Sequence, residues 1–130
     1  MKGIAQFVAG VALAISIGAL ADAPSNKISP AQVIERIDGK DAELVILDVR
    51  TPEEFAAGHL PGARNISHDQ LLARIAELDD AKDKDIVVYC RSGRRSELAI
   101  KDMKTQGFER LLHLEGDMLE WQAQQRPLAK

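Results

Sequence analysis

A single cysteine stands among three arginines in the segment YCRSGRRS, residues 89–96. Cys90 is the only cysteine in the chain of 130 residues. Cationic neighbours favour the thiolate over the thiol, and the thiolate is the nucleophilic form of sulfur. Gly93 permits a backbone conformation in which successive N–H groups turn toward one anion. We therefore expect a reactive cysteine that faces an anion; the alternative is a small, buried and inert core residue.

The residues that follow Cys90 are expected to bind the substrate. They are Arg91, Ser92, Gly93, Arg94, Arg95 and Ser96. Their backbone N–H groups would hold an anion, and Arg91 and Arg95 come before Arg94 as candidates for a charge contact with it. The histidines lie far from Cys90 in sequence. We therefore expect activation by charge and hydrogen bonds rather than by a Cys–His pair, unless the fold brings a histidine close.

Short apolar runs alternate with amphipathic segments along the chain. The expected buried strands are residues 44–49 (LVILDV), 86–89 (IVVY) and 111–114 (LLHL). The expected helices are residues 30–37, 52–57, 69–78, 96–105 and 117–125. This alternation is typical of an α/β domain with a mainly parallel sheet, whose ligand site lies at the carboxyl ends of the strands. Cys90 follows a strand directly, so the pattern places it at that edge.

Two segments carry the signals of a helix start. In residues 29–32 (SPAQ), a serine, a proline and a glutamine occupy the positions of an N-cap, a first helical residue and a capping box. Residues 51–54 (TPEE) repeat this pattern, and the helix dipole favours the two glutamates there. Gly58 is expected to end the second of these helices.

The first 21 residues have the composition of a secretory signal peptide. Lys2 is followed by nineteen residues without a charge, and the run ends on ALA at residues 19–21. A short positive start, an apolar stretch and small residues before the cleavage point mark such a peptide. We expect a signal peptide over residues 1–21, a linker over 22–28, a folded domain over 29–127 and a tail over 128–130.

Cleavage of this segment predicts a periplasmic or secreted protein with no membrane contact afterwards. A retained membrane anchor is the alternative, because nineteen apolar residues just span a bilayer. Both interpretations place the folded part across a membrane from the cytoplasm.

Charge and cysteine content exclude several other classes of protein. The chain has 17 basic and 20 acidic residues, a net charge of −3, which argues against nucleic-acid binding through phosphate neutralisation. One cysteine forms no intrachain disulfide and no multi-cysteine zinc site. The sequence has no metal motif, phosphate-binding glycine loop or dinucleotide fingerprint. We expect neither a metal nor an organic cofactor.

Three segments together resemble the rhodanese domain. They are LDVRTPEEFAAGHLPGARNI (residues 47–66), YCRSGRRS (89–96) and GFERLLHLEGDMLEW (107–121), in the order and spacing of that family. The resemblance covers about residues 29–127 and implies an α/β rhodanese-like domain, with a five-stranded, mainly parallel sheet and helices on both faces. It also implies a six-residue active loop headed by the catalytic cysteine, here Cys90 to Arg95.

The activity that the resemblance implies is sulfur transfer. Cys90 would take the outer sulfur from a small anionic donor such as thiosulfate, hold it as a persulfide, and pass it to cyanide or to a thiol, including a protein thiol. One alternative is a sulfur carrier or partner-docking module without turnover. Another is a phosphatase or arsenate reductase of the same fold, whose loop is one residue longer; here Ser96 stands where their arginine would be.

A few residues outside the loop are expected to be structural. The resemblance suggests that Asp48 and Arg50 support the active-site edge through a buried ion pair or hydrogen bonds. His59 is expected to stabilise a turn. Asp117 stands where the third motif commonly has the second of two glycines, and we expect it to cap the last helix. The alternative for Asp117 is a negative charge near the pocket, which leaves the acceptor preference open.

Overall fold

The computed structural model describes residues 26–130. The expected signal peptide, residues 1–21, lies outside the described residues, as do residues 22–25 of the expected linker. Within residues 26–130, no helix is both long enough and apolar enough to cross a membrane.

The centre of the fold is a parallel sheet of five strands in the order β1-β5-β4-β2-β3. The strands are β1 (Lys27–Ile28), β2 (Leu44–Asp48), β3 (Arg64–Asn65), β4 (Asp85–Tyr89) and β5 (Leu111–Leu114). The five-stranded parallel sheet and the three expected strands are confirmed. The linker expected over residues 22–28 is wrong at its end, because residues 27–28 pair with β5 as an edge strand. Two residues are too few to show a period of two in the sequence.

Within residues 26–130, four α-helices and one 3₁₀-helix surround the sheet. They are α2 (Pro30–Asp38), α3 (Pro52–Ala57), the 3₁₀-helix η1 (Ile75–Ala81), α4 (Arg94–Thr105) and α5 (Asp117–Ala123). Both expected capping boxes are present, at Ser29 and Thr51, and Gly58 ends α3 as expected.

The prediction of an α-helix over residues 69–78 is wrong. Turns precede η1 there, and tight bonds such as Glu77 N–H to the carbonyl of Arg74 replace an α-helical ladder. Leu71 and Leu78 are buried all the same, so the turns satisfy the apolar spacing that suggested a helix. Ser67 also donates a side-chain hydrogen bond to Asp69, and such local bonds compete with helix formation.

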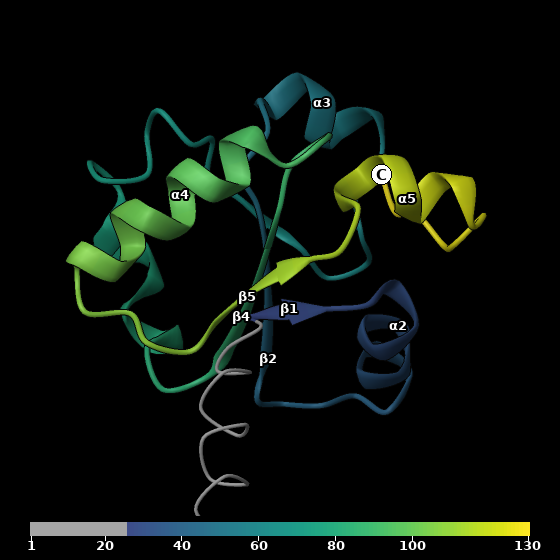
Figure 1. The fold of residues 1–130 in the computed structure, drawn as a ribbon, viewed down its shortest axis with the longest axis horizontal. Coiled ribbons are helices and arrows are strands. Elements are labelled where there is room, and N and C mark those ends of the chain that lie inside the picture. The colour runs from purple at the N-terminus through teal and green to yellow at the C-terminus, as the bar shows by residue number, and fades with distance from the viewer. Residues whose placement is uncertain (1–25) are drawn as a thin grey trace, which may run out of the picture.

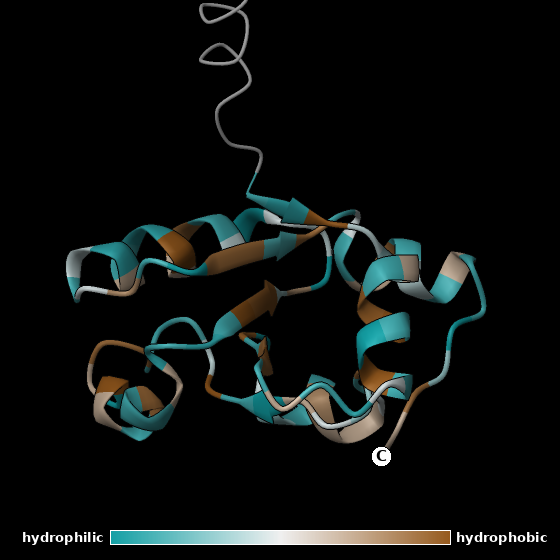
Figure 2. Cartoon of the chain, turned by 90° about the horizontal axis from the view of Figure 1, so that it is seen from below, coloured by the Kyte–Doolittle hydropathy of each residue, from teal (hydrophilic) through white to brown (hydrophobic). Residues whose placement is uncertain are grey.

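Each face of the sheet carries its own hydrophobic cluster. Helix α4 and η1 cover one face, and α2 and α5 cover the other (Figure 1). Figure 2 shows hydrophobic residues on the strands and alternating hydrophobic and hydrophilic bands on the helices. Because successive strand residues point to opposite faces, Tyr89 packs in the cluster under α2 and α5, and Cys90 packs in the one under α4. The side chains of Tyr89 and Cys90 therefore lie on opposite faces of the sheet at the carboxyl end of β4.

Candidate active site

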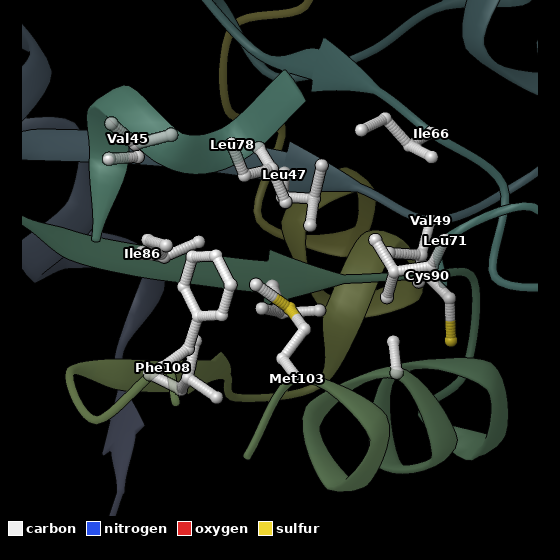
Figure 3. Close-up of a cluster of buried hydrophobic side chains, with 14 residues drawn as sticks. Val45, Leu47, Val49, Ile66, Leu71, Leu78, Ile86, Cys90, Met103 and Phe108 are labelled. Atoms are coloured by element: carbon white, nitrogen blue, oxygen red, sulfur yellow. The ribbon is translucent and has the colours of Figure 1, made fainter. Parts of the chain in front are cut away.

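Cys90 directly follows the carboxyl end of β4, at the edge of the sheet where ligands bind in this class of fold. Only 2% of the residue is exposed, and its side chain lies beside Val49 and Leu71 at one end of the core cluster (Figure 3). The sulfur is also engaged by the loop, because the backbone N–H of Gly93 donates to Cys90 Sγ over 3.0 Å. The cysteine is therefore packed like a core residue and hydrogen-bonded like the anion expected in the loop.

Gly93 makes this contact possible through its backbone conformation. Its φ is 119°, in the region that side chains disfavour, and it is the N-cap of α4. Helix α4 therefore begins at Arg94, two residues earlier than the sequence suggests, and Ser96 lies buried inside its first turn. A Cβ placed on Gly93 would lie 3.1 Å from Asp117 Oδ2. The residue must be small because a carboxylate lies directly against it.

The three arginines of the loop differ in their surroundings. Arg91 and Arg94 are exposed, and within residues 26–130 neither has an ion-pair partner. Arg95 is instead held by Glu54, with Nη1 to Oε1 at 2.6 Å and Nη2 to Oε2 at 3.1 Å. Arg91 can therefore contact an anion, as expected, and Arg94 can do so equally well. Arg95, which was expected to come before Arg94, already forms an ion pair with Glu54.

Glu54 connects the starts of two helices. Its carboxylate accepts from the backbone N–H and the hydroxyl of Thr51 at the start of α3, as well as from Arg95 at the start of α4. The hydrogen bond from Arg95, together with those from Thr51, lowers the pKa of Glu54 to about 2. The sequence suggested the capping box with Thr51 and a favourable interaction with the helix dipole, but not the ion pair with Arg95. The ion pair joins residues 41 positions apart, so local spacing could not reveal it.

Asp117 is not the N-cap of α5, contrary to expectation. Gly116 takes that position with a φ of 75°, and Asp117 is the first helical residue, with a φ of 51°. The side chain is buried and turns back to the active loop, where Oδ1 accepts from the N–H of Cys90 at 3.0 Å and from the hydroxyl of Ser96 at 2.8 Å. Asp117 thus places a negative charge next to the active loop, in agreement with the alternative interpretation of this residue.

His113 shares this carboxylate. Its Nε2 lies 3.0 Å from both oxygens of Asp117, and since an ionised carboxylate only accepts, the proton is assigned to that nitrogen. Burial raises the pKa of Asp117, but hydrogen bonds from His113, from the Cys90 amide and from Ser96 outweigh it, and the pKa lies below its usual value. The fold thus brings a histidine to the loop, joined to the backbone of Cys90 through Asp117. The two residues are four apart, but His113 lies on β5 and Asp117 begins α5, so the helical i,i+4 rule does not predict this pair.

Asp48 and Arg50 form the ion pair that the resemblance suggested. Arg50 Nη2 lies 2.6 Å from Asp48 Oδ2, both side chains are buried, and the same nitrogen donates to the carbonyl of Gly58 at 2.7 Å. The guanidinium also lies 5.6 Å from the ring centre of Tyr89, whose hydroxyl accepts from the N–H of Leu60. Burial, followed by the nearby Asp48 charge, raises the pKa of Tyr89. Through Arg50, these contacts connect the segment after β2 to Tyr89, the last residue of the strand before Cys90.

His59 stabilises a turn, as expected. Its Nδ1 lies 2.8 Å from the carbonyl of Phe55, and the two rings stack with centres 3.7 Å apart. The backbone of His59 also exchanges two hydrogen bonds with Ala129, so part of the expected tail is fixed to the domain.

A polar cavity of about 450 Å³ borders the active loop. Its lining includes Ser92, Gly93, Arg94, His113 and Asp117, together with Lys27, Glu97, Leu114, Glu115 and Gly116, and does not include Cys90. Within residues 26–130, no group of three or more His, Cys, Asp or Glu side chains could hold a metal ion. The arrangement offers a buried sulfur, an N–H aimed at it, the start of a twelve-residue helix, and the exposed Arg91 and Arg94. These groups together stabilise negative charge on sulfur.

Comparison with known proteins gives one family match and relatives with more than one named function. Residues 29–124 match the model of the rhodanese-like domain. A sulfurtransferase of Allochromatium vinosum is 34% identical over 96 residues, covering 74% of this chain and 87% of that protein. YrkF of Bacillus subtilis, a candidate sulfur carrier protein, is 38% identical over 87 residues, covering 67% of this chain and 45% of YrkF. A rhodanese-related protein of Thermoplasma volcanium has a similar structure, with a TM-score of 0.69 and 27% identity over 79% of this chain and 96% of that one.

Proposed function

Because the chain belongs to the rhodanese-like domain family and has a sulfurtransferase among its relatives, we propose that it transfers sulfur from thiosulfate or a persulfide donor through a persulfide on Cys90. The acceptor is a thiol or cyanide. The observation that carries the proposal is the N–H of Gly93, which donates to Cys90 Sγ over 3.0 Å at the start of α4. A hydrogen bond at this place stabilises both a thiolate and a persulfide anion.

In the first half of the reaction, the Cys90 thiolate attacks the outer sulfur of thiosulfate. A bond forms between Cys90 Sγ and that sulfur, the S–S bond of thiosulfate breaks, and its electron pair leaves with sulfite. The products are a Cys90 persulfide anion and sulfite, so the total charge is unchanged. The backbone N–H groups of the loop would hold the new terminal sulfur, as the N–H of Gly93 already holds Cys90 Sγ.

In the second half, an acceptor thiolate or cyanide attacks the terminal sulfur of the persulfide. The bond between the two sulfurs breaks, and its electron pair returns to Cys90 as the thiolate. Cys90 is the only thiol of the chain, so no second cysteine of the same chain competes for this sulfur.

Electrostatic repulsion opposes the first step, because a dianion must approach a thiolate. Arg91 and Arg94 are exposed beside the loop, and their two charges offset this repulsion and stabilise the departing sulfite. Arg95 contributes less to the anion because Glu54 neutralises it at 2.6 Å.

The direct test compares wild type with Cys90→Ser in a thiosulfate:cyanide assay. We expect turnover in wild type and none above background in the variant, because serine keeps the size of the side chain but is a much weaker nucleophile. After donor alone, the intact mass of wild type should increase by one sulfur atom and that of the variant should not. Equal rates for the two proteins contradict the enzyme proposal.

A non-turnover sulfur carrier is the second candidate, and the similarity to YrkF favours it. The two candidates differ in the second half of the reaction. An added sulfur on Cys90 that small thiols and cyanide do not remove would indicate a carrier that serves one dedicated protein. Rapid removal by small acceptors would indicate the enzyme.

We do not propose a phosphatase or arsenate reductase. Ser96 stands at the position where their longer loop has an arginine, and it is buried and donates to Asp117 at 2.8 Å. A neutral hydroxyl directed at a carboxylate does not supply the positive charge that a phosphate needs.

We propose in addition that the protein is exported, on the basis of the charge and apolar pattern of residues 1–21. The full chain, produced in a bacterium, should appear in the periplasmic fraction or the medium with a mass that corresponds to cleavage after Ala21. An intact chain in the membrane fraction would indicate a retained anchor instead.

A further inference from the structure

Asp117 has a backbone conformation that favours glycine. Its φ is 51°, and Gly116 before it has a φ of 75°, so two successive residues are in the left-handed region. A side chain at such a position is strained and persists where its own contacts compensate. Aspartate tolerates this region better than most residues, but the sequence could satisfy the backbone more simply with glycine. The contacts of the side chain therefore need an explanation.

Those contacts all converge on the active loop and its support. Oδ1 accepts from the N–H of Cys90 and from the hydroxyl of Ser96, and both oxygens lie 3.0 Å from His113 Nε2. Cys90 begins the loop, and Ser96 lies in the first turn of the helix that follows it. One carboxylate therefore binds both ends of the loop, and His113 holds the carboxylate from β5.

The contacts also place Asp117 against the residue that touches the sulfur. A Cβ on Gly93 would lie 3.1 Å from Asp117 Oδ2, and Gly93 is the residue whose N–H donates to Cys90 Sγ. The carboxylate therefore lies next to the residue whose N–H contacts the sulfur, and it limits where the backbone of that residue can lie.

We propose that Asp117 is a positioning residue, which fixes the loop so that the Gly93 amide is aimed at the sulfur of Cys90 and at the persulfide formed on it. The inference rests on the proposed sulfur transfer and assigns a further residue to that reaction. Asp117 acts through its hydrogen bonds with Cys90, Ser96 and His113. His113 assists by holding both carboxylate oxygens in one orientation.

Three variants separate this role from a merely structural one. Asp117→Gly removes the carboxylate and relieves the backbone strain, so it favours the observed φ. Asp117→Asn keeps an oxygen that can accept from Cys90 and Ser96, and its NH₂ can donate to His113 in the other tautomer. Lys40→Gly is the matched control, because Lys40 is exposed, has a φ of 54° and lies in the turn after α2.

The kinetic experiment measures kcat and KM for thiosulfate in these variants and in wild type. We expect Asp117→Gly to lower kcat by roughly 10- to 100-fold without raising KM, because misplacement of a group near the reacting atom costs rate rather than binding. Asp117→Asn should keep most of the wild-type kcat, and Lys40→Gly all of it. A wild-type kcat in Asp117→Gly overturns the proposal, and so does a loss in Asp117→Asn equal to that in Asp117→Gly.

A second measurement requires no sulfur donor. Amide hydrogen exchange should be faster at Gly93 in Asp117→Gly than in wild type, and unchanged in Asp117→Asn, while the amides of β4 stay protected in all variants. Unchanged exchange at Gly93 in Asp117→Gly overturns the positioning role. If wild type transfers no sulfur from any donor, the proposed function fails, and exchange at Gly93 still decides whether Asp117 positions the loop.

Discussion

Two loops meet at the carboxyl edge of the sheet, and they use charge in different ways. Asp48, the last residue of β2, pairs at 2.6 Å with Arg50 in the loop that follows; both are buried, and this loop leads to Glu54. The loop after β4 begins with Cys90 and exposes Arg91 together with Arg94. Charges in the first loop are neutralised within the protein, whereas those in the second are left for a ligand.

The difference separates support from reactivity. A buried ion pair with further hydrogen bonds holds a backbone in one arrangement but offers nothing to a substrate. Exposed cations contribute little to stability but attract an anion. Arg95 follows Cys90 in the sequence, but its charge is neutralised by Glu54, which follows the first loop. It therefore resembles the paired charges of the first loop. Mutations in the first loop should therefore lower mainly the free energy of unfolding, and mutations of the exposed arginines in the second should affect mainly substrate binding.

The largest loss is expected at the buried pair. Arg50→Met leaves the Asp48 carboxylate without its partner and the Gly58 carbonyl without a donor, which should cost about 3–5 kcal/mol of unfolding free energy. Arg64→Met is the control, since the side chains of Arg64 and Asp80 are 39% and 59% exposed; it should cost about 0–1 kcal/mol. Urea denaturation measures both, and similar losses would contradict the assignment of Asp48 and Arg50 as support.

The next effect is expected at Gly93. Gly93→Ala adds a Cβ at a φ of 119° and 3.1 Å from Asp117 Oδ2, so it should cost about 1–3 kcal/mol and reduce sulfur transfer more than tenfold. Gly62→Ala is the matched control, because Gly62 has a φ of 80° with no atom within 4 Å of the added Cβ. It should cost stability through strain alone and keep full activity. Full activity in Gly93→Ala would mean that its N–H is not needed at the sulfur.

The ion pair between Glu54 and Arg95, which joins the two loops, should make the stability depend on pH. The pKa of Glu54 lies at about 2 instead of its usual 4.5, so its contribution is complete above the usual value and is lost as the pH falls toward 2. Glu54→Gln can keep the capping box and removes only the charge. It should cost about 1 kcal/mol or less at neutral pH, because the pair is partly exposed. Melting temperatures should converge with those of wild type near pH 2; a constant difference down to that pH contradicts the ion pair.

The smallest change in stability is expected for the exposed arginines. Arg91→Ala and Arg94→Ala should change the unfolding free energy by about 0.5 kcal/mol or less. Each should raise KM for thiosulfate more than KM for a neutral persulfide donor, because the loss concerns charge. Arg95→Ala should raise KM for thiosulfate less than Arg94→Ala, since Glu54 holds Arg95. Equal effects on both donors would count against direct anion contact.

The parts of the fold that sequence predicts are those with a local cause. Continuous apolar runs predict β2, β4 and β5, and serine or threonine followed by proline predicts the starts of α2 and α3. The strands β1 and β3 have two residues each, and only the neighbouring strands define them. The start of α4 depends on the φ of Gly93, which no periodicity shows.

The same distinction holds for the candidate site. The composition around Cys90 identifies the loop, because reactive cysteines need positive surroundings close in sequence. The partners of Arg95 and Asp117 could not be predicted in this way, since Glu54 is 41 residues from Arg95 and Cys90 is 27 residues from Asp117. Aspartate is also a common N-cap, so its local preference pointed away from its actual position.

Strand β4 is the middle strand of the sheet, and its position determines how the site can move. It pairs with β2 over five register positions and with β5 over three, so it is hydrogen-bonded along both edges. Local unfolding of β4 would break both ladders and have a free energy close to that of global unfolding, whereas residues 91–93 lie outside these ladders and open at lower cost. Immediately after Cys90 the chain therefore passes from a strand bonded along both edges to a loop that Asp117 and α5 hold through a few hydrogen bonds. A second sulfur atom on Cys90 would be accommodated on the side of this loop, while the strand keeps the first sulfur in place.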